Sequence, residues 1–213
     1  SLAKKETMIN KKILVLREQG IGEEILFSSM YKELITLNNN LKIETDSRLI
    51  KIFERSFQNK VFVQDGYYSK KKEVFKNFDS VIFAGSLCAF FRKNKKDFLK
   101  IPYLVADQTK VEEIKENQIF SLQKLKIGLS WKSVVSVYGR LKSLTLSDFA
   151  PLFKKGRQFV NLQYGDVERE INLEKNKHFN LLSFDKIDLF NDLEGLMSIL
   201  KNIDVFVTVS NST

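Results

Sequence analysis

The sequence predicts an α/β protein made of two halves, each a parallel β-sheet covered by helices. Apolar runs of strand length alternate with stretches of helical spacing, and this pattern starts again near the middle of the chain. Hydrophobic residues make up 43% of the 213 residues and include 18 phenylalanines. Such a content is sufficient for a packed core and argues against a disordered chain.

The first half contains four short apolar runs that are typical of buried strands. They are residues 12–16, 41–44, 61–63 and 81–84. Helical spacing of apolar residues covers 23–37, and Ser47 is suited to cap a shorter helix that ends at Phe57. The aromatic and basic stretch 86–98 also has helical character.

The second half repeats this scheme. Strands are expected at 127–131, 159–163, 180–184 and 205–209. A helix over 146–153 would be capped by Thr145 or Ser147. A second helix would run from an Asn191 cap to Lys201, with Glu194 placed for a capping box.

The predicted elements divide the chain into four parts, although no Gly/Ser-rich linker marks the division. A polar N-terminal tail (1–10) precedes an N-terminal Rossmann-like domain (11–106). A charged linker or bridging helix (107–123) leads to a C-terminal Rossmann-like domain (124–213). Because the chain ends just after a predicted strand, we expect this second domain to be incomplete and the sequence to be a fragment.

Composition narrows the classes of function. The net charge is +9, with lysine-rich runs at 70–72 and 92–96, so these runs are either solvated surface or a face for an anionic substrate or a membrane. No nucleic-acid-binding signature accompanies them, and no nucleic-acid partner is expected. A single cysteine, Cys88, and a single histidine argue against disulfides and against a metal site, and they fit the cytoplasm.

A glycine-containing acidic loop follows the first predicted strand. Gly20 and Gly22 allow a tight turn and a close backbone approach, and Glu23 then begins a helix at the carboxyl edge of the sheet. A carboxylate there can act as a general base toward a hydroxyl. Alternatively, Glu23 and Glu24 only complement the helix dipole.

Polar and cationic residues follow three strands or loops of the second half. Ser130, Trp131, Lys132 and Ser133 leave its first strand, and the indole there either stacks on a base or sugar or packs at the domain seam. Arg140 and Lys142 precede a helix and suggest an anion clamp, or else an exposed loop. The last strand runs into a turn that suits either phosphate binding or an ordinary helix cap. That turn consists of Ser210, Asn211, Ser212 and Thr213.

These constellations, in this order, resemble the heptosyltransferase-like glycosyltransferases (glycosyltransferase family nine), and in particular the bacterial members attached to tetratricopeptide repeats. The matching stretches are REQGIGEEILFSSMYKEL, SLCAFFRKNKKDFLKIPYLVAD, KIGLSWKS, LKSLTLSDFAPLFKKGRQFVNLQYGD and DLEGLMSILKNIDVFVTVSNST. The resemblance implies a GT-B architecture of two Rossmann-like domains. It also implies an inverting, metal-independent transfer from a nucleotide-sugar donor, with no further cofactor.

The resemblance also implies roles for residues. Glu23 would be the base in an acceptor loop with Gly20 and Gly22, while Lys142 and Arg140 would hold the diphosphate. Residues 130–133 would line the donor pocket, and 210–213 would bind phosphate or sugar. The acceptor would be a glycan, a glycolipid or a protein, and the basic N-terminal face suits an anionic glycolipid or peripheral contact with a membrane. The family's last motif continues into a helix that this chain lacks, so we expect the fragment to be inactive.

Of two other candidate functions, one fits the sequence better than the other. A non-catalytic GT-B-like module would bind a carbohydrate or a partner, with Glu23 in place of the family's usual aspartate. A Rossmann dehydrogenase is disfavoured, because no GxGxxG motif is followed by an acidic residue at the end of the second strand.

Overall fold

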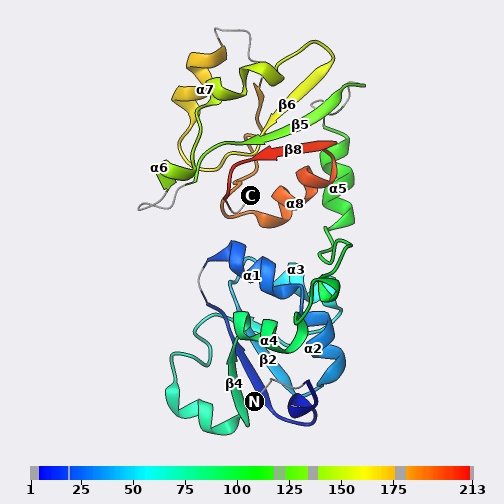
Figure 1. The fold of residues 1–213 in the computed structure, drawn as a ribbon. Helices are drawn as coiled ribbons and strands as arrows, with labels where there is room; N and C mark the ends of the chain where they lie inside the picture. The colour runs from blue at the N-terminus through cyan, green and yellow to red at the C-terminus, as the bar shows by residue number, and fades with distance from the viewer. Residues whose placement is uncertain are drawn as a thin grey trace. The chain divides into compact units, whose positions relative to one another are not determined.

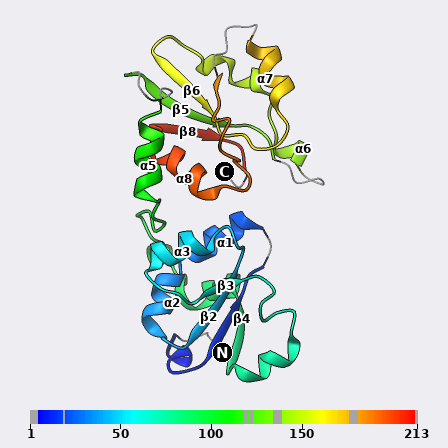
Figure 2. The ribbon, with the colours of Figure 1, turned by 180° about the vertical axis from the view of Figure 1, so that it is seen from behind.

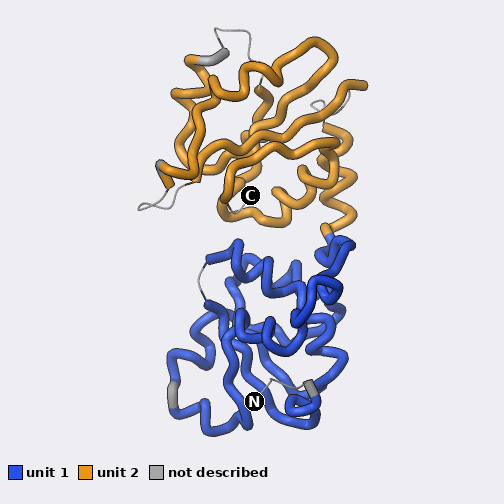
Figure 3. The backbone as a smooth tube through the Cα atoms, in the orientation of Figure 1, with its two compact units in different colours: residues 1–105 blue, residues 106–213 orange. Residues whose placement is uncertain are grey.

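The described parts of the chain form two parallel β-sheets of four strands each, one in each of two compact units. The computed structural model describes residues 5–18, 20–117, 120, 123–133, 139–175 and 181–211. The units are residues 1–105 and 106–213 (Figure 3). Their strand orders, β3-β2-β1-β4 and β7-β6-β5-β8, follow the same 3-2-1-4 pattern, which is the order of the first four strands of a Rossmann sheet.

Sheet one lies in the first unit, shown in blue to green in Figure 1. Its strands are β1 (Ile13–Leu16), β2 (Leu41–Thr45), β3 (Phe62–Gln64) and β4 (Ser80–Phe83). The accompanying α-helices are α1 (Ile21–Ser28), α2 (Tyr31–Leu37), α3 (Ile50–Phe57) and α4 (Cys88–Phe91). Short 3-10 helices lie at Lys5–Met8, Lys72–Asn77, Ala84–Leu87 and Lys95–Asp97.

Aromatic rings fill the core of the first unit between α2, α3 and β3. Tyr31 lies 5.7 Å from Phe53 and 6.0 Å from Phe62 between ring centroids. Phe57 contacts the same group. Met8 is also buried, and its carbonyl accepts a hydrogen bond from Asn38 Nδ2 at 2.7 Å. This part of the predicted tail therefore packs with the first unit.

Sheet two lies in the second unit. Its strands are β5 (Leu125–Ser130), β6 (Arg157–Asn161), β7 (Leu181–Leu182) and β8 (Val205–Thr208). The helices are α5 (Gln108–Lys115), α6 (Gly139–Lys142), the 3-10 helix η6 (Leu146–Leu152), α7 (Glu168–Lys175) and α8 (Leu193–Lys201). Helices α5 and α8 lie side by side in both views (Figures 1 and 2), and Asn202 Nδ2 donates to the carbonyl of Val111 at 2.9 Å. The predicted bridging helix thus packs with the second unit.

All eight predicted strands are confirmed, although residue 180 of one lies outside the described residues, but several helix predictions change. The stretch expected to be helical over 86–98 is interrupted, because α4 covers only Cys88–Phe91 between two short 3-10 helices. The helix expected over 146–153 is the 3-10 helix η6, which contains Pro151. The helix expected over 23–37 is two helices, with a break at residues 29–30. Leu49 rather than Ser47 stands at the N-cap of α3, without a side-chain hydrogen bond. Asp192 rather than Asn191 caps α8, because its Oδ1 accepts from the Gly195 N–H at 2.8 Å. Within the described residues, no helix is long and apolar enough to span a membrane.

Candidate functional site

The carboxyl ends of β5, β6 and β8 bring polar groups together in the second unit. Because these strands are parallel, the segments that leave them emerge at one edge of the sheet, which is where open α/β folds bind ligands. These segments are residues 130–133, 161–166 and 209–211.

Gln163 is the centre of this edge. Its side chain is buried, and its Oε1 accepts hydrogen bonds from Ser130 Oγ at 3.1 Å, the Trp131 N–H at 2.8 Å and the Lys132 N–H at 2.7 Å. Its Nε2 donates to the Tyr164 carbonyl at 2.7 Å. A single amide therefore fixes the turn that follows β5. Sequence reasoning missed this residue, because a polar side chain after a strand gives no sign that it is buried.

Asn211 joins the end of β8 to the same turn. Its Nδ2 donates to Ser130 Oγ at 2.6 Å and to the Lys132 carbonyl at 3.2 Å, while its Oδ1 accepts from Thr208 Oγ1 at 3.2 Å. The structure thus brings Ser130, Lys132 and Asn211 together, whereas Ser210 is exposed. The predicted site residues Ser212 and Thr213 lie outside the described residues.

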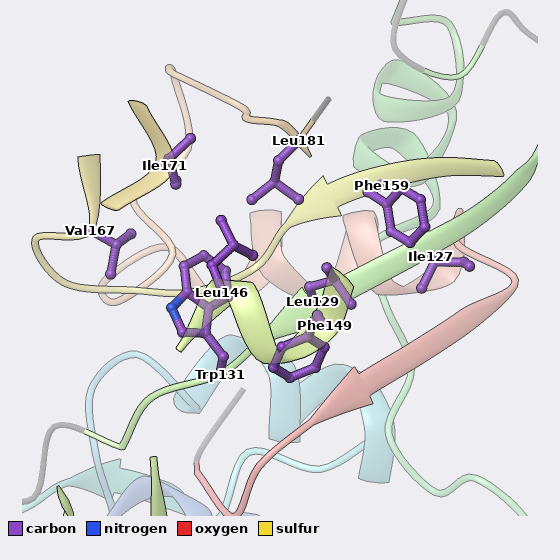
Figure 4. Packing of buried hydrophobic residues seen from close by; sticks show 9 residues of the cluster. All are labelled: Ile127, Leu129, Trp131, Leu146, Phe149, Phe159, Val167, Ile171 and Leu181. Atoms are coloured by element: carbon purple, nitrogen blue, oxygen red, sulfur yellow. The ribbon is translucent and has the colours of Figure 1, made fainter. Parts of the chain in front are cut away.

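Trp131 does not lie where the sequence suggested. It is completely buried among the hydrophobic side chains of the second unit, so no ligand can stack on it (Figure 4). Its Nε1 donates to Glu170 Oε2 at 3.0 Å, which satisfies the only polar atom of the ring. The prediction of a stacking plate is therefore wrong, because the side chain turns into the core of the second unit beside Leu146.

Glu170, on α7, connects several parts of this edge. Its carboxylate pairs with Lys132 Nζ at 2.5 Å and accepts from the Leu146 N–H at 2.8 Å, besides its bond to Trp131. Burial acts to raise its pKa, but the hydrogen bonds from Lys132, Leu146 and Trp131 outweigh burial and hold the pKa below the ordinary value. Part of the positive charge of Lys132 is therefore already compensated within the protein.

The loop around α6 lies next to the same turn. The Ser133 N–H donates to Ser143 Oγ at 3.0 Å, and Ser143 Oγ donates to the Gly139 carbonyl at 2.7 Å. Lys142 is exposed. For Arg140 the structure describes the backbone within α6 but not the side chain.

A pocket of about 580 Å³ opens beside Gln163, between the ends of β6 and β7 and the start of α7. Its polar lining includes Asn161, Asp166, Glu168, Ser183 and Asp185. Sequence reasoning did not predict these residues as a site, although the Gly165-Asp166 turn after a strand was a usable signal. The pocket provides carboxylate and amide groups at the carboxyl edge of the sheet, where open α/β folds bind ligands.

In the first unit, Glu23 is exposed at the start of α1. Its Oε2 accepts from the Gly20 N–H at 3.2 Å in a capping box. A Cβ at Gly20 would lie 3.1 Å from this oxygen, so glycine leaves room for the carboxylate. Gly22 belongs to the first turn of the helix. Glu23 therefore stabilises the helix start and is also accessible to a substrate, and whether it acts as a base stays a prediction.

The neighbouring acid, Glu24, is buried, and sequence reasoning gave it no separate role. Its Oε2 accepts from Thr45 Oγ1 at 2.6 Å and from the Asp46 N–H at 2.9 Å, and its Oε1 lies 2.6 Å from Arg17. Burial raises the pKa of Glu24, and this effect exceeds the opposing effects of the hydrogen bonds and of Arg17. These contacts join the ends of β1 and β2 and give Glu24 a structural role.

Two units, each with a parallel sheet whose polar groups gather at the carboxyl edge, define an α/β protein with a GT-B-like fold. A solved structure with this fold is ADP-heptose lipopolysaccharide heptosyltransferase II of Escherichia coli. The likeness covers 94% of this chain and 80% of that one, with a TM-score of 0.61 and 12% sequence identity. At that identity, the comparison establishes the heptosyltransferase-like fold alone.

A relative by sequence is protein FlbA of Caulobacter vibrioides. It is 26% identical over 228 residues, which cover 95% of this chain but 37% of FlbA. The chain thus spans little more than a third of the length of the curated relative that it matches. No family model matches the sequence.

Proposed function

We propose that this chain carries the core of a glycosyltransferase, which transfers a sugar from a nucleotide-diphosphate sugar to a hydroxyl group of a glycan, glycolipid or protein. The observation that carries the proposal is the polar edge of sheet two, where a pocket adjoins the turn fixed by Gln163. The heptosyltransferase-like fold supports the same class of reaction. A cytoplasmic location is part of the proposal.

In the proposed site, the pocket beside Gln163 receives the nucleoside. The carboxylates of Asp166 and Glu168 line it and suit the hydroxyls of a ribose. Lys142 and Arg140 are proposed to balance the charge of the diphosphate as it leaves. Lys142 is preferred over Lys132 for this role, because Lys132 is already paired with Glu170.

The proposed reaction is a metal-independent displacement with inversion. Glu23 removes the proton from the acceptor hydroxyl, and the oxygen of that hydroxyl attacks the anomeric carbon of the donor sugar. The bond from that carbon to the diphosphate oxygen breaks, and the diphosphate leaves with the bonding electrons. General base catalysis of this kind contributes about 10²–10⁴-fold to the rate.

Turnover by the longest natural form of the protein tests the role of Glu23. Glu23→Gln retains an acceptor for the Gly20 N–H, so the fold should persist while sugar transfer falls by about 10²-fold or more. Glu18→Gln is the matched control, because Glu18 is an exposed acid of the same loop and glutamine keeps an acceptor for the Gly85 N–H that Glu18 binds. Unchanged transfer in Glu23→Gln would remove this residue from the mechanism, and a loss confined to Glu18→Gln would make Glu18 the base.

Calorimetric titration with ADP, UDP, GDP and CDP tests the donor site. Lys142→Ala should weaken binding of the preferred diphosphate by roughly tenfold, since a charge-assisted hydrogen bond contributes about 1.5–3 kcal/mol. Lys155→Ala is the control, because Lys155 is an exposed lysine of the same unit that lies just before β6, at the amino edge of the sheet and so opposite the proposed site. Equal affinities of the two variants would refute the anion clamp.

A second candidate is a non-catalytic module that binds a nucleotide-sugar or a carbohydrate. It is favoured by the capping box, which already engages the Glu23 carboxylate. Tight binding of a nucleotide-sugar by the longest natural form of the protein, without hydrolysis or transfer, would establish this alternative.

A further inference from the structure

The segment between α4 and α5 combines exposed apolar side chains with lysines. Phe98, Leu99 and Ile101 are 57%, 45% and 70% exposed. The lysines interspersed with them are exposed as well, and they are Lys93, Lys95, Lys96 and Lys100. We call residues 93–101 the basic-apolar segment.

Hydrogen bonds hold both ends of this segment on the first unit. Before it, Arg92 pairs with Glu33 at 2.7 Å and donates to the Ser29 carbonyl at 2.7 Å. After it, the Tyr103 hydroxyl donates to the Ile25 carbonyl at 2.7 Å. The segment is thus a surface loop attached firmly at both ends to the α1–α2 region.

Within the segment, Asp97 is the one acidic residue of the sequence 93–101, and its carboxylate is engaged locally. Its Oδ2 accepts from the Asn94 N–H at 2.8 Å in the capping box of the 3-10 helix Lys95–Asp97. That bond lowers the pKa of Asp97, so this carboxylate stays charged at lower pH than an ordinary aspartate does. The positive charges of the four lysines outnumber the single negative charge of Asp97, so the loop presents net positive charge around its apolar side chains.

Solvation explains exposed lysines, but it does not explain three large apolar side chains within four residues. A soluble surface gains nothing from exposing Phe98, Leu99 and Ile101 together, because each would be more stable out of water. Surfaces that combine such side chains with lysines bind at the boundary of anionic bilayers, where the apolar groups enter the headgroup region and the lysines face lipid phosphates.

We infer that the basic-apolar segment docks the first unit on an anionic membrane surface. The partner is a bilayer that carries acidic lipid headgroups, and the binding has two parts. The lysines supply an attraction that salt screens, and the apolar side chains supply a part that salt leaves in place. This binding does not depend on the proposed glycosyl transfer, because it needs neither donor nor acceptor.

Co-sedimentation with vesicles tests the inference, using the longest natural form of the protein. The vesicles are phosphatidylcholine alone, or phosphatidylcholine with about one-third phosphatidylglycerol, at about 0.1 M and about 0.5 M NaCl. At low salt, the wild-type protein should bind the anionic vesicles and not those of phosphatidylcholine alone. At high salt, its binding to the anionic vesicles should become weak. Lys95→Gln/Lys96→Gln/Lys100→Gln should reduce the partition coefficient about fivefold per lysine, or roughly a hundredfold in all.

A second variant isolates the apolar part. Phe98→Ser/Ile101→Ser should reduce partitioning by roughly tenfold or more at both salt concentrations. Matched controls come from the second unit, where Lys154→Gln/Lys155→Gln removes exposed charge and Leu173→Ser removes an exposed apolar side chain. Both should bind like wild type.

Three results would overturn the inference. The first is that wild-type protein stays in the supernatant when anionic vesicles are pelleted, and the second is an equal loss of binding in the control variants. The third is wild-type binding retained by both segment variants. All substituted side chains are exposed, so unchanged thermal melts would show that a loss of binding is not a loss of folding.

Discussion

Removing the Gln163 side chain should destabilise the second unit far more than its single uncharged amide suggests. Gln163→Ala would leave the Trp131 N–H without its partner inside the core, where an unsatisfied group costs about 1–3 kcal/mol. The Lys132 N–H and the Tyr164 carbonyl are only partly buried, so each adds less. Together with a small cavity, the loss should reach about 4 kcal/mol.

Gln163→Met separates hydrogen bonding from packing. Methionine fills nearly the same volume but has no amide, so this variant should lose about 3 kcal/mol, with the difference from alanine due to the cavity. Gln123→Met is the matched control, because Gln123 is an exposed glutamine of the same unit. Its stability should stay within about 0.5 kcal/mol of wild type.

The chain contains its own probe for this experiment. Its only tryptophan, Trp131, is completely buried in the second unit, so tryptophan fluorescence during urea denaturation reports the unfolding of that unit. With a urea dependence of about 2 kcal/mol/M, a loss of 3 kcal/mol lowers the midpoint by about 1.5 M. A midpoint for Gln163→Met within about 0.3 M of wild type would refute the central role of these hydrogen bonds.

Three further predictions concern single side chains. Burial raises the pKa of Glu24 above 4.5, so the folded protein favours the protonated side chain. The resulting contribution to stability is full below pH 4.5 and is lost as the pH rises through the raised pKa, and thermal melts of Glu24→Gln between about pH 4 and 8 should not show this loss. For Glu170 the pH dependence of stability is reversed, because the pKa of this carboxyl group is lowered. Its contribution to stability is present above pH 4.5 and is lost as the pH falls through the lowered pKa. Acid unfolding followed by Trp131 fluorescence should therefore show a smaller loss of stability in Glu170→Gln. Gly195→Ala should destabilise α8 by about 1 kcal/mol in calorimetry despite its better helix propensity, because the new Cβ would lie 2.5 Å from Asp192 Oδ2.

The inner strands could be predicted from sequence because burial on both faces leaves a direct signal. All four residues of β1 are buried, and its sequence is a continuous apolar run. Helix ends gave a weaker signal. No glycine or proline marks the break between α1 and α2, and Asn191 and Asp192 are neighbouring residues with similar capping ability, so the sequence alone did not choose between them.

The candidate site could be predicted only in part, because its organisation depends on contacts between distant residues. Ser130 and Asn211 were recognised from their positions after strands, and they are hydrogen-bonded across 81 positions. Trp131 was misplaced because its position after a strand does not tell which way the ring turns. Gln163 and Glu170 were missed because their roles come from the groups that surround them.

The pairing of β4 and β8 has a consequence for how the protein is made. Each joins the central strand of its sheet from far along the chain, with the Lys12 N–H bonded to Asp79 and the Lys126 N–H bonded to Asp204. On the ribosome, the first sheet can close once residue 83 has emerged, while the second waits for residue 208. In each unit the outer edge of the first strand, β1 or β5, therefore stays open to mispairing until its distant partner strand has been made, over 67 and 78 positions between the hydrogen-bonded residues.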